Sequence, residues 1–334
     1  MKILVVGSGL SAAVIARELA ENGSHITVID KRHHIGGNCF DEEIDHVLVH
    51  RYGPHIFHTS KENVVAWINR FSEWTPYRHR VKALLENGTL VTIPANKETL
   101  ATLGSKQQVV DILFRPYTKK MWGLSIEEIN PAILNRVPIR EDLNDLYFPE
   151  DSFQALPKNG YTKFILEILN HPNIEIKLNF AFAKHLEKSF DFIFNSMPID
   201  EYFDFTLGRL PYRSIKFHQF TLPIPKILPV ATLNYTHTGP FTRVTEWKHF
   251  PNSNSHPWQT TVTVEEPCDY SENNWEPYYP INDLHQKNIS LFNKYKSMVP
   301  HYMKFIGRCG TYSYIDMDDA IDLSLNIAKR FLSK

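Results

Sequence analysis

The sequence has little cysteine and no long run of one charge. Its three cysteines, Cys39, Cys268 and Cys309, lie far apart and form no C-x-x-C pair, which argues against a disulfide framework, a zinc ribbon or a dithiol reductase. The 36 Lys and Arg residues balance 37 Asp and Glu residues, for a formal net charge of -1. With no basic tract, the chain is not expected to bind nucleic acid or an anionic membrane surface.

Long hydrophobic runs are missing too. The first apolar run, in "MKILVVG", stops at Gly7, well short of a signal-peptide core or a membrane span. We therefore expect a cytoplasmic protein without a membrane span. Because 43% of the 334 residues are hydrophobic, the chain has enough apolar surface to build a full-sized core and two or three domains.

The N-terminal segment predicts a βαβ unit that binds a dinucleotide. Residues 3–6 and 26–30 are expected strands, and residues 12–21 are the expected helix between them. Gly7, Gly9 and Ala12 form G-x-G-x-x-A, in which the glycines permit a tight turn and a close approach of the pyrophosphate to the backbone. The phosphates would lie at the helix N-terminus. Asp30, 21 residues after Gly9, is placed to accept hydrogen bonds from the adenosine ribose.

The next stretch, "KRHHIGGNCF", favours FAD as the dinucleotide. Gly36 and Gly37 place two glycines where the chain turns back across the nucleotide, and such a loop suits close passage along a long cofactor. An ordinary flexible turn is the alternative. No second G-x-G-x-x-G occurs, so we expect a flavin without a dedicated NAD(P)H domain.

After residue 60 the pattern leaves the βαβ type. Asn87-Gly88 predicts a hairpin over 81–94, and residues 105–134 are mostly helical in spacing, with Pro116 and Pro131 as expected breaks. Residues 227–236 and 259–267 indicate an antiparallel sheet. Residues 190–198 are a strand that would rejoin the first sheet, and a last helix would begin after Asp316 as its N-cap.

The predicted fold class is α/β, with a discontinuous Rossmann-like FAD-binding domain, a small helical domain and an antiparallel β-sheet substrate domain. The three domains are assigned by residue range. The FAD-binding domain takes 1–75, 185–205 and 300–334, the helical lid takes 98–135, and the sheet domain takes 76–97, 136–184 and 206–299.

The stretch "RYGPHIFHT" at 51–59 places His55 and His58 three residues apart. It can be read as a metal site, a core segment or the wall of a pocket. No third Cys, His or carboxylate lies at a recognisable spacing, so no metal is predicted. A core role remains open for one of the two histidines, His55 more than His58.

Five stretches combine arginine with aromatic residues: 115–123, 134–148, 241–250, 276–283 and 307–317. Arginines bind phosphate through paired, charge-assisted hydrogen bonds, and aromatic faces stack on bases and sugars. Taken singly, each stretch also fits surface ion pairs and core tyrosines. Together with "VGSGLSAAV", "DKRHHIGGN", "YGPHIFHT" and "GYTKF", their order and spacing resemble the UDP-galactopyranose mutase family nearly from end to end.

This resemblance implies an isomerase that interconverts pyranose and furanose forms of a nucleotide-sugar. In that family the cofactor FAD acts when reduced: its N5 attacks the anomeric carbon, the nucleoside diphosphate departs, and the sugar ring opens and recloses. The partners implied are a UDP- or dTDP-linked sugar, NAD(P)H as an external reductant, and a second copy of the chain in a homodimer. A cofactor acting as nucleophile also explains why no Ser-His-Asp or paired-carboxylate constellation is apparent.

The resemblance assigns site residues in three groups. The expected catalytic residues are Arg136, Arg243 and His58. The expected substrate-binding residues are Tyr117, Trp122, Arg140, Tyr147, Tyr279, Tyr314 and His55. The expected cofactor-binding residues are Gly7, Gly9, Leu10, Ser11, Asp30, Lys31, Gly36, Gly37, Asn38, Arg308, Asp316 and Met317.

The chain departs from the family by being shorter between the hairpin at 81–94 and Tyr117, and by bulky residues at Trp247 and Phe153. The shortening leaves the dimer, the base and the sugar open, so UDP-galactose, UDP-N-acetylgalactosamine and dTDP-fucose all remain candidate substrates. Two other functions stay open: an FAD-dependent oxidase or dehydrogenase of the amine-oxidase type, and a non-catalytic nucleotide-sugar binder.

Overall fold

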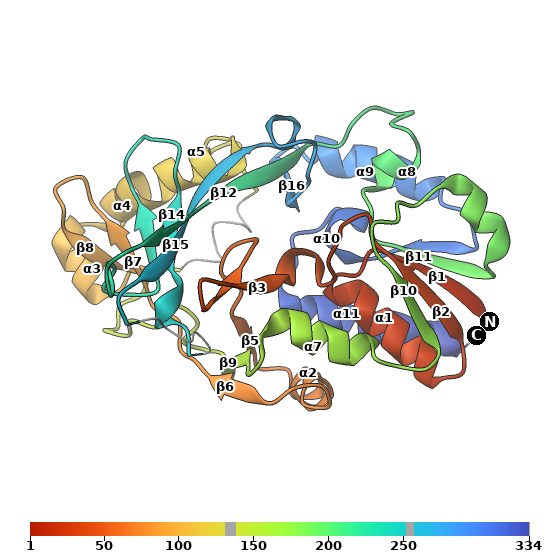
Figure 1. Cartoon of the computed structure of the whole chain (residues 1–334). Helices are drawn as coiled ribbons and strands as arrows, with labels where there is room; N and C mark the ends of the chain where they lie inside the picture. The colour runs from red at the N-terminus through yellow and green to blue at the C-terminus, as the bar shows by residue number, and fades with distance from the viewer. Residues whose placement is uncertain (131–137, 252–256, 334) are drawn as a thin grey trace.

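The computed structural model describes residues 1–130, 138–251 and 257–333. Figure 1 shows two parts side by side: a parallel sheet with its helices, where both chain ends lie, and a larger twisted sheet with helices at its far end. This arrangement confirms the predicted combination of a Rossmann-like domain with a mostly antiparallel sheet.

The parallel sheet has the order β10-β2-β1-β11-β17. Its strands are short and largely buried, as expected of a sheet covered by helices: β1 (Lys2–Val6), β2 (His25–Ile29), β10 (Ile174–Lys177), β11 (Phe192–Asn195) and β17 (Met303–Phe305). The expected return of 190–198 to this sheet is confirmed, since β11 pairs with β1. β10 also pairs with β2, so the assignment of all of 136–184 to the sheet domain is wrong for this strand.

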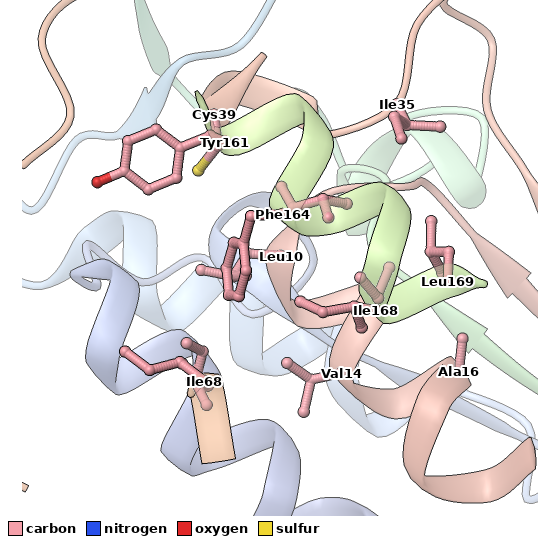
Figure 2. Packing of buried hydrophobic residues seen from close by; sticks show 14 of the residues in the cluster. Leu10, Val14, Ala16, Ile35, Cys39, Ile68, Tyr161, Phe164, Ile168 and Leu169 are labelled. Carbon is pink, nitrogen blue, oxygen red and sulfur yellow. The ribbon is translucent and has the colours of Figure 1, made fainter. Parts of the chain in front are cut away.

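Three helices cover the parallel sheet: α1 (Leu10–Glu21), α7 (Gly160–Leu169) and α11 (Met317–Leu332). Figure 2 shows Leu10 and Val14 of α1 beside Phe164 and Ile168 of α7, all of them buried. Burying each such side chain stabilises the fold by about 1.5–3 kcal/mol. The βαβ unit is therefore a fixed platform for the turn that joins β1 to α1.

The second sheet has the order β16-β12-β15-β14-β13-β7-β8. The predicted hairpin at Asn87-Gly88 joins β7 (Val81–Leu84) to β8 (Leu90–Ile93), and Gly88 has the positive φ of 86° that its turn requires. The other strands are β12 (Tyr212–Leu222), β13 (Thr232–Tyr235), β14 (Arg243–Glu246), β15 (Thr260–Asp269) and β16 (Tyr279–Pro280). In Figure 1, β12 and β15 extend from the helical end toward the nucleotide domain.

A helical segment packs on β7 and β8 through Leu103, Val109 and Leu113. It comprises α3 (Lys97–Leu103), α4 (Lys106–Val109), a π-helical turn (Val110–Phe114) and α5 (Arg115–Trp122). The expected break at Pro116 is wrong. Pro116 lies in the first turn of α5, directly after the wider π turn, where its missing N–H is tolerated.

Smaller elements connect the two parts. β3 (Asp41–Ile44) pairs with β4 (Val47–His50), and β9 (Phe153–Pro157) lies between β5 (Phe57–Thr59) and β6 (Trp74–Pro76). The stretch "RYGPHIFHT" thus runs from the end of β4 through β5. The remaining helices are α2 (Glu62–Ile68), α8 (Ile199–Tyr202), α9 (Lys287–Ser297) and α10 (Gly307–Gly310). Within the described ranges, no helix is long and apolar enough to cross a membrane.

Candidate active site

A first cavity of about 280 Å³ lies at the β1–α1 turn. Gly9 is the N-cap of α1 and no side chain caps the helix, so the first-turn N–H groups are available to an anion. Gly7 has a φ of 93°, and a Cβ there would lie 2.0 Å from Ser196 Oγ. The turn therefore requires glycine for two reasons: the positive φ of its backbone, and its close packing on Ser196, which directly follows β11.

Gly36 and Gly37 face this turn. Gly36 donates its N–H to the Ser8 carbonyl at 3.0 Å, and a Cβ on Gly37 would lie 2.9 Å from Gly9 Cα. Both residues have positive φ, 94° and 57°. The paired glycines thus serve a close contact between two backbone loops, whereas the sequence suggested that they pass along the cofactor. Both still line the cavity.

Asp30 follows β2 and anchors the same turn. Its Oδ2 accepts hydrogen bonds from Ser8 N at 2.8 Å and Ser8 Oγ at 2.6 Å, and its Oδ1 accepts from Arg32 N at 2.9 Å. The Arg32 guanidinium lies 4.7 Å from the centre of the Tyr52 ring and forms an ion pair with Glu276. This pair joins the nucleotide domain to the loop before β16 at the cavity wall.

All twelve expected cofactor-binding residues line the first cavity. They come from the β1–α1 turn, the segment after β2, α10 and the start of α11: Gly7, Gly9, Leu10, Ser11, Asp30, Lys31, Gly36, Gly37, Asn38, Arg308, Asp316 and Met317. Phe180 and Phe182 complete the wall at the edge near β10.

A second cavity, of about 300 Å³, lies between α5, the β13–β14 pair and the segment 51–59 that carries His55 and His58, called the histidine loop below. Seven of the expected substrate and catalytic residues line it: His55, His58, Tyr117, Trp122, Tyr147, Arg243 and Tyr314. Tyr117 and Trp122 come from α5, so one helix supplies an aromatic wall. The Trp122 ring also packs edge-on against Tyr314, with centroids 5.5 Å apart.

The two cavities share part of their walls. Five residues line both: His55, Tyr278, Arg308, Asp316 and Met317. Arg308 donates to the Ile315 carbonyl at 2.9 Å, and its guanidinium lies 5.1 Å from the centre of the Tyr314 ring. Molecules bound in the two cavities would therefore touch at this junction.

Arg243 is, besides Arg308, a cation that lines the second cavity. It begins β14, and its Nε lies 2.7 Å from Oε1 of the fully buried Glu265 on β15. Burial lowers the pKa of Arg243, but the Glu265 carboxylate, with smaller contributions from Tyr117 and Tyr278, raises this pKa above its ordinary value, so the guanidinium stays charged. Gly53 packs on this pair: a Cβ there would lie 2.9 Å from Glu265 Oε1 and 3.5 Å from Arg243 Nη2.

The two histidines of "RYGPHIFHT" differ in environment. His58 Nδ1 lies 2.7 Å from Asp151 Oδ2, and its ring stacks on Phe148 with centroids 3.5 Å apart. His55 Nδ1 donates to the Gly53 carbonyl at 2.8 Å, which leaves Nε2 as an acceptor. Burial lowers the pKa of His55 to about 3, so this ring is neutral near pH 7.

Not every expected site residue lies at a cavity. Arg136 lies outside the described residues. Arg140 does not line either cavity, and its guanidinium donates to the carbonyls of Leu146 and Asn144 at 3.1 and 2.7 Å. Tyr279 is fully buried and donates to the Met121 carbonyl.

Trp247 and Phe153, the two bulky departures, are packing residues. Trp247 is fully buried beneath the histidine loop and donates its ring N–H to Thr263 Oγ1 at 2.8 Å. Phe153 packs against the rings of Phe57 and Trp74. Neither residue narrows the second cavity.

Sequence reasoning missed several residues of the second cavity, among them Tyr278, His79, Asn234 and Phe148. The alternation of a strand places Tyr278 and Tyr279 on opposite sides, but it does not say which side faces the ligand. Asn234 Oδ1 is buried without a hydrogen-bond partner among the described residues, which suits a ligand donor. No group of three or more metal-ligating side chains occurs in the described ranges.

Comparisons with known proteins agree with this geometry. Residues 112–314 match the family model described as UDP-galactopyranose mutase, and residues 5–71 match an NAD(P)-binding Rossmann-like domain. The chain is 35% identical to a probable UDP-galactopyranose mutase of Klebsiella pneumoniae, with 99% of this chain and 94% of the relative covered. It is 34% identical to a dTDP-fucopyranose mutase of Escherichia coli, with 99% and 98% covered.

Solved structures share the fold. The crystal structure of a reduced UDP-galactopyranose mutase superposes with a TM-score of 0.75 at 14% identity, covering 99% of this chain and 94% of the other. A putrescine oxidase bound to putrescine has a TM-score of 0.57 at 10% identity, with 100% of each chain covered. From the family model and the near full-length relatives, the chain belongs to the UDP-galactopyranose mutase family, whose members are isomerases.

Proposed function

We propose that this chain is a flavin-dependent mutase that interconverts the pyranose and furanose forms of a nucleotide-sugar, with UDP-galactose as the first candidate substrate. The observation that carries this proposal is the junction of the two cavities: a dinucleotide site and a cavity with an arginine and an aromatic wall share five residues. A cofactor and a sugar bound there would be in contact, as a reaction between them requires.

The first cavity fits FAD. The open N-terminus of α1 would hold the pyrophosphate, Asp30 would lie at the ribose, and Arg308 with Met317 would lie against the flavin ring. Bound and reduced FAD would supply the nucleophile for the anomeric carbon, and NAD(P)H is the proposed reductant. The chain itself therefore needs no nucleophilic side chain.

The protein's residues position the nucleotide-sugar and hold its diphosphate. Tyr117 and Trp122 would stack on the base, and Arg243 would bind the diphosphate as it leaves and returns. Arg136 is proposed as a second phosphate ligand. Tyr147 and Tyr314, which line the same cavity, would contact the diphosphate.

The histidine loop would act on the sugar side of the junction. His55 presents an acceptor nitrogen at the shared wall, and His58, held by Asp151 and Phe148, lies deeper in the second cavity. Tyr278, which lines the cavity, is proposed as a substrate contact in place of Tyr279. These polar groups would fix the orientation of the sugar hydroxyls toward the cofactor.

A dTDP-6-deoxyhexose is the second candidate substrate, because the dTDP-fucopyranose mutase relative is 34% identical over nearly its whole length. UDP-N-acetylgalactosamine remains a third. A sugar pocket discriminates through a few side chains, each worth about 1–3 kcal/mol. A homodimer remains a prediction of the family resemblance.

The test is net turnover of the reduced protein with UDP-galactopyranose, UDP-N-acetylgalactosamine and a dTDP-fucose. Chromatography would follow the furanose product, and an oxygen electrode would follow O₂. The proposal expects an equilibrium mixture of the two ring forms, with reductant needed in catalytic amounts. O₂ consumed in step with product would establish the oxidase, and binding without turnover would establish the nucleotide-sugar binder.

A further inference from the structure

Lys120 lies next to the aromatic wall of the second cavity but does not line it. Its ammonium group donates to three backbone carbonyls, those of Tyr235, His237 and Phe241, at 2.9, 2.9 and 2.8 Å. These carbonyls belong to the end of β13 and to the connection between β13 and β14. All three donors of the ammonium group are therefore satisfied by one short loop.

Three carbonyl oxygens that converge on one point repel one another unless a cation lies between them. The loop is tied to the sheet at both ends, where Thr236 Oγ1 donates to the Leu84 carbonyl at 2.8 Å and Thr242 N donates to the Glu265 carbonyl at 2.9 Å. Between these ends the Lys120 ammonium group holds the carbonyls together. Arg243 is the next residue after Thr242, so the loop conformation determines where β14 begins.

The backbone of residue 120 is held from the other side. Arg213 on β12 donates to the carbonyls of Lys120 and Met121 at 2.9 and 3.1 Å. These hydrogen bonds satisfy carbonyl groups of the last turn of α5 that have no partner within the helix. A single residue thus joins α5, β12 and the β13–β14 loop. Lys120 therefore lies between two walls of the second cavity. The Tyr117 and Trp122 side chains belong to one wall, and the Arg243 side chain belongs to the opposite wall.

We propose that Lys120 is a positioning residue that sets the distance between the aromatic wall and the phosphate-binding arginine of the second cavity. The inference rests on the proposed function for its kinetic consequence, because the two walls would hold the base and the diphosphate of one substrate. Without the tether, the walls would separate and a nucleoside diphosphate would bind less tightly. The first cavity, which Lys120 does not touch, would bind flavin as before.

The test compares Lys120→Met, Lys120→Arg and Lys119→Met in the flavin-bound protein. Lys119 is the matched control, because it is exposed and precedes Lys120 on the same helix. We expect Lys120→Met to raise KM for the nucleotide-sugar and the Kd for UDP about ten- to a hundredfold, as loss of charged hydrogen bonds does. Turnover at saturation and flavin content would stay close to the wild type. Lys120→Arg would restore part of the affinity, and Lys119→Met would match the wild type.

Hydrogen exchange of the amides in 236–242 provides a readout that needs no turnover. Faster exchange there in Lys120→Met, but not in Lys119→Met, supports the tether even if the wild type isomerises no nucleotide-sugar, in which case only the proposed function fails. Unchanged exchange and unchanged UDP affinity in Lys120→Met would overturn the inference. A fall in turnover with parallel loss of flavin would also overturn it, because that pattern is general destabilisation.

Discussion

The two cavities are built in different ways. The first is made largely from backbone: two glycine loops in contact, the N-terminus of α1 and a carboxylate that anchors the turn. The second is made from side chains that α5, β14 and the histidine loop bring together over long sequence separations. A cavity formed by backbone tolerates little change in conformation. A cavity formed by side chains can change which ligand it prefers through a few amino-acid substitutions. The first therefore suits a constant cofactor and the second a variable sugar.

The largest expected effect tests the backbone site. Gly37→Ala places a Cβ 2.9 Å from Gly9 Cα at a positive φ of 57°, so the two loops must separate. We expect the purified variant to carry no flavin, measured as visible absorbance per protein. Gly23→Ala is the control, because Gly23 also has positive φ but faces open space. Full flavin occupancy in Gly37→Ala would show that the loop contact does not shape the cavity.

Acid is expected to act on the second cavity. Burial lowers the pKa of His50, His55 and His79 to about 3 each, from 6.5. Between these values the unfolded chain binds protons that the folded chain does not, so the free energy of unfolding falls as pH drops below 6.5. The limit is about 1.4 kcal/mol per pH unit for each histidine.

Urea unfolding between pH 7.5 and 5 would measure this slope. His79→Asn should reduce the slope of the free energy of unfolding against pH by the contribution of one histidine. Equal stability at both ends of the range would contradict the assignment of three neutral histidine rings, of which His55 and His79 line the second cavity.

Removing the Arg243 guanidinium from the second cavity should slow turnover while leaving flavin bound. Arg243→Ala deletes charge-assisted phosphate contacts of about 1.5–3 kcal/mol, which corresponds to a loss of roughly ten- to a few hundredfold in kcat/KM. Arg243→Lys should also lose activity, because a point charge does not reproduce the bidentate fork. Arg115→Ala, an exposed arginine paired with Asp111 and Glu127, is the control. Equal kinetics for the Arg115 and Arg243 variants would remove Arg243 from the site.

Gly53→Ala tests how tightly the histidine loop rests on the Arg243–Glu265 pair. The added Cβ would lie 2.9 Å from Glu265 Oε1 and 3.2 Å from the Phe217 ring, so the loop or the pair must shift. We expect KM for the nucleotide-sugar to rise about tenfold, corresponding to the loss of roughly one hydrogen bond. Gly88→Ala, at an open turn with similar φ, should leave KM unchanged. A wild-type KM in Gly53→Ala would uncouple the loop from Arg243.

The smallest effect is expected from Asp151→Asn. The carboxylate accepts from His58 Nδ1 at 2.7 Å, and asparagine keeps an acceptor but removes the charge. We expect turnover to fall about three- to tenfold, with a changed pH profile and little change in UDP affinity. Asp145→Asn, an exposed partner of Arg80, is the control. A change confined to UDP affinity would place His58 at the nucleotide instead.

The part of the first cavity formed by the βαβ unit could be predicted from sequence, because its residues are close in sequence and its conformation is local. Gly7, Gly9 and Asp30 predict a turn whose geometry depends on residues near it in the sequence. Even there the contact of Gly36-Gly37 with the β1–α1 turn was not predicted, since a contact between two loops is tertiary. β10 was assigned to the wrong domain for the same reason, because strand order depends on pairing across the fold and not on local pattern.

The second cavity was only partly predictable. Family resemblance placed Tyr117, Trp122 and Arg243, all of which line it. It did not distinguish Tyr278 from Tyr279, whose environments differ because one strand face meets the cavity and the other meets α5. Arg140 was expected to bind substrate, but in the structure it binds backbone carbonyls of its own loop. Whether such a residue reaches the cavity depends on the direction of its side chain, and spacing in the sequence alone does not predict that direction.

The most direct test of the account is the visible spectrum of the purified protein before and after dithionite, followed by incubation with UDP-galactofuranose and with dTDP-fucofuranose. The account predicts a flavin spectrum, and pyranose product only after reduction. A colourless protein would contradict the assignment of the first cavity. A flavoprotein that forms pyranose equally well when oxidised would contradict the proposal that cofactor and sugar react where the two cavities meet.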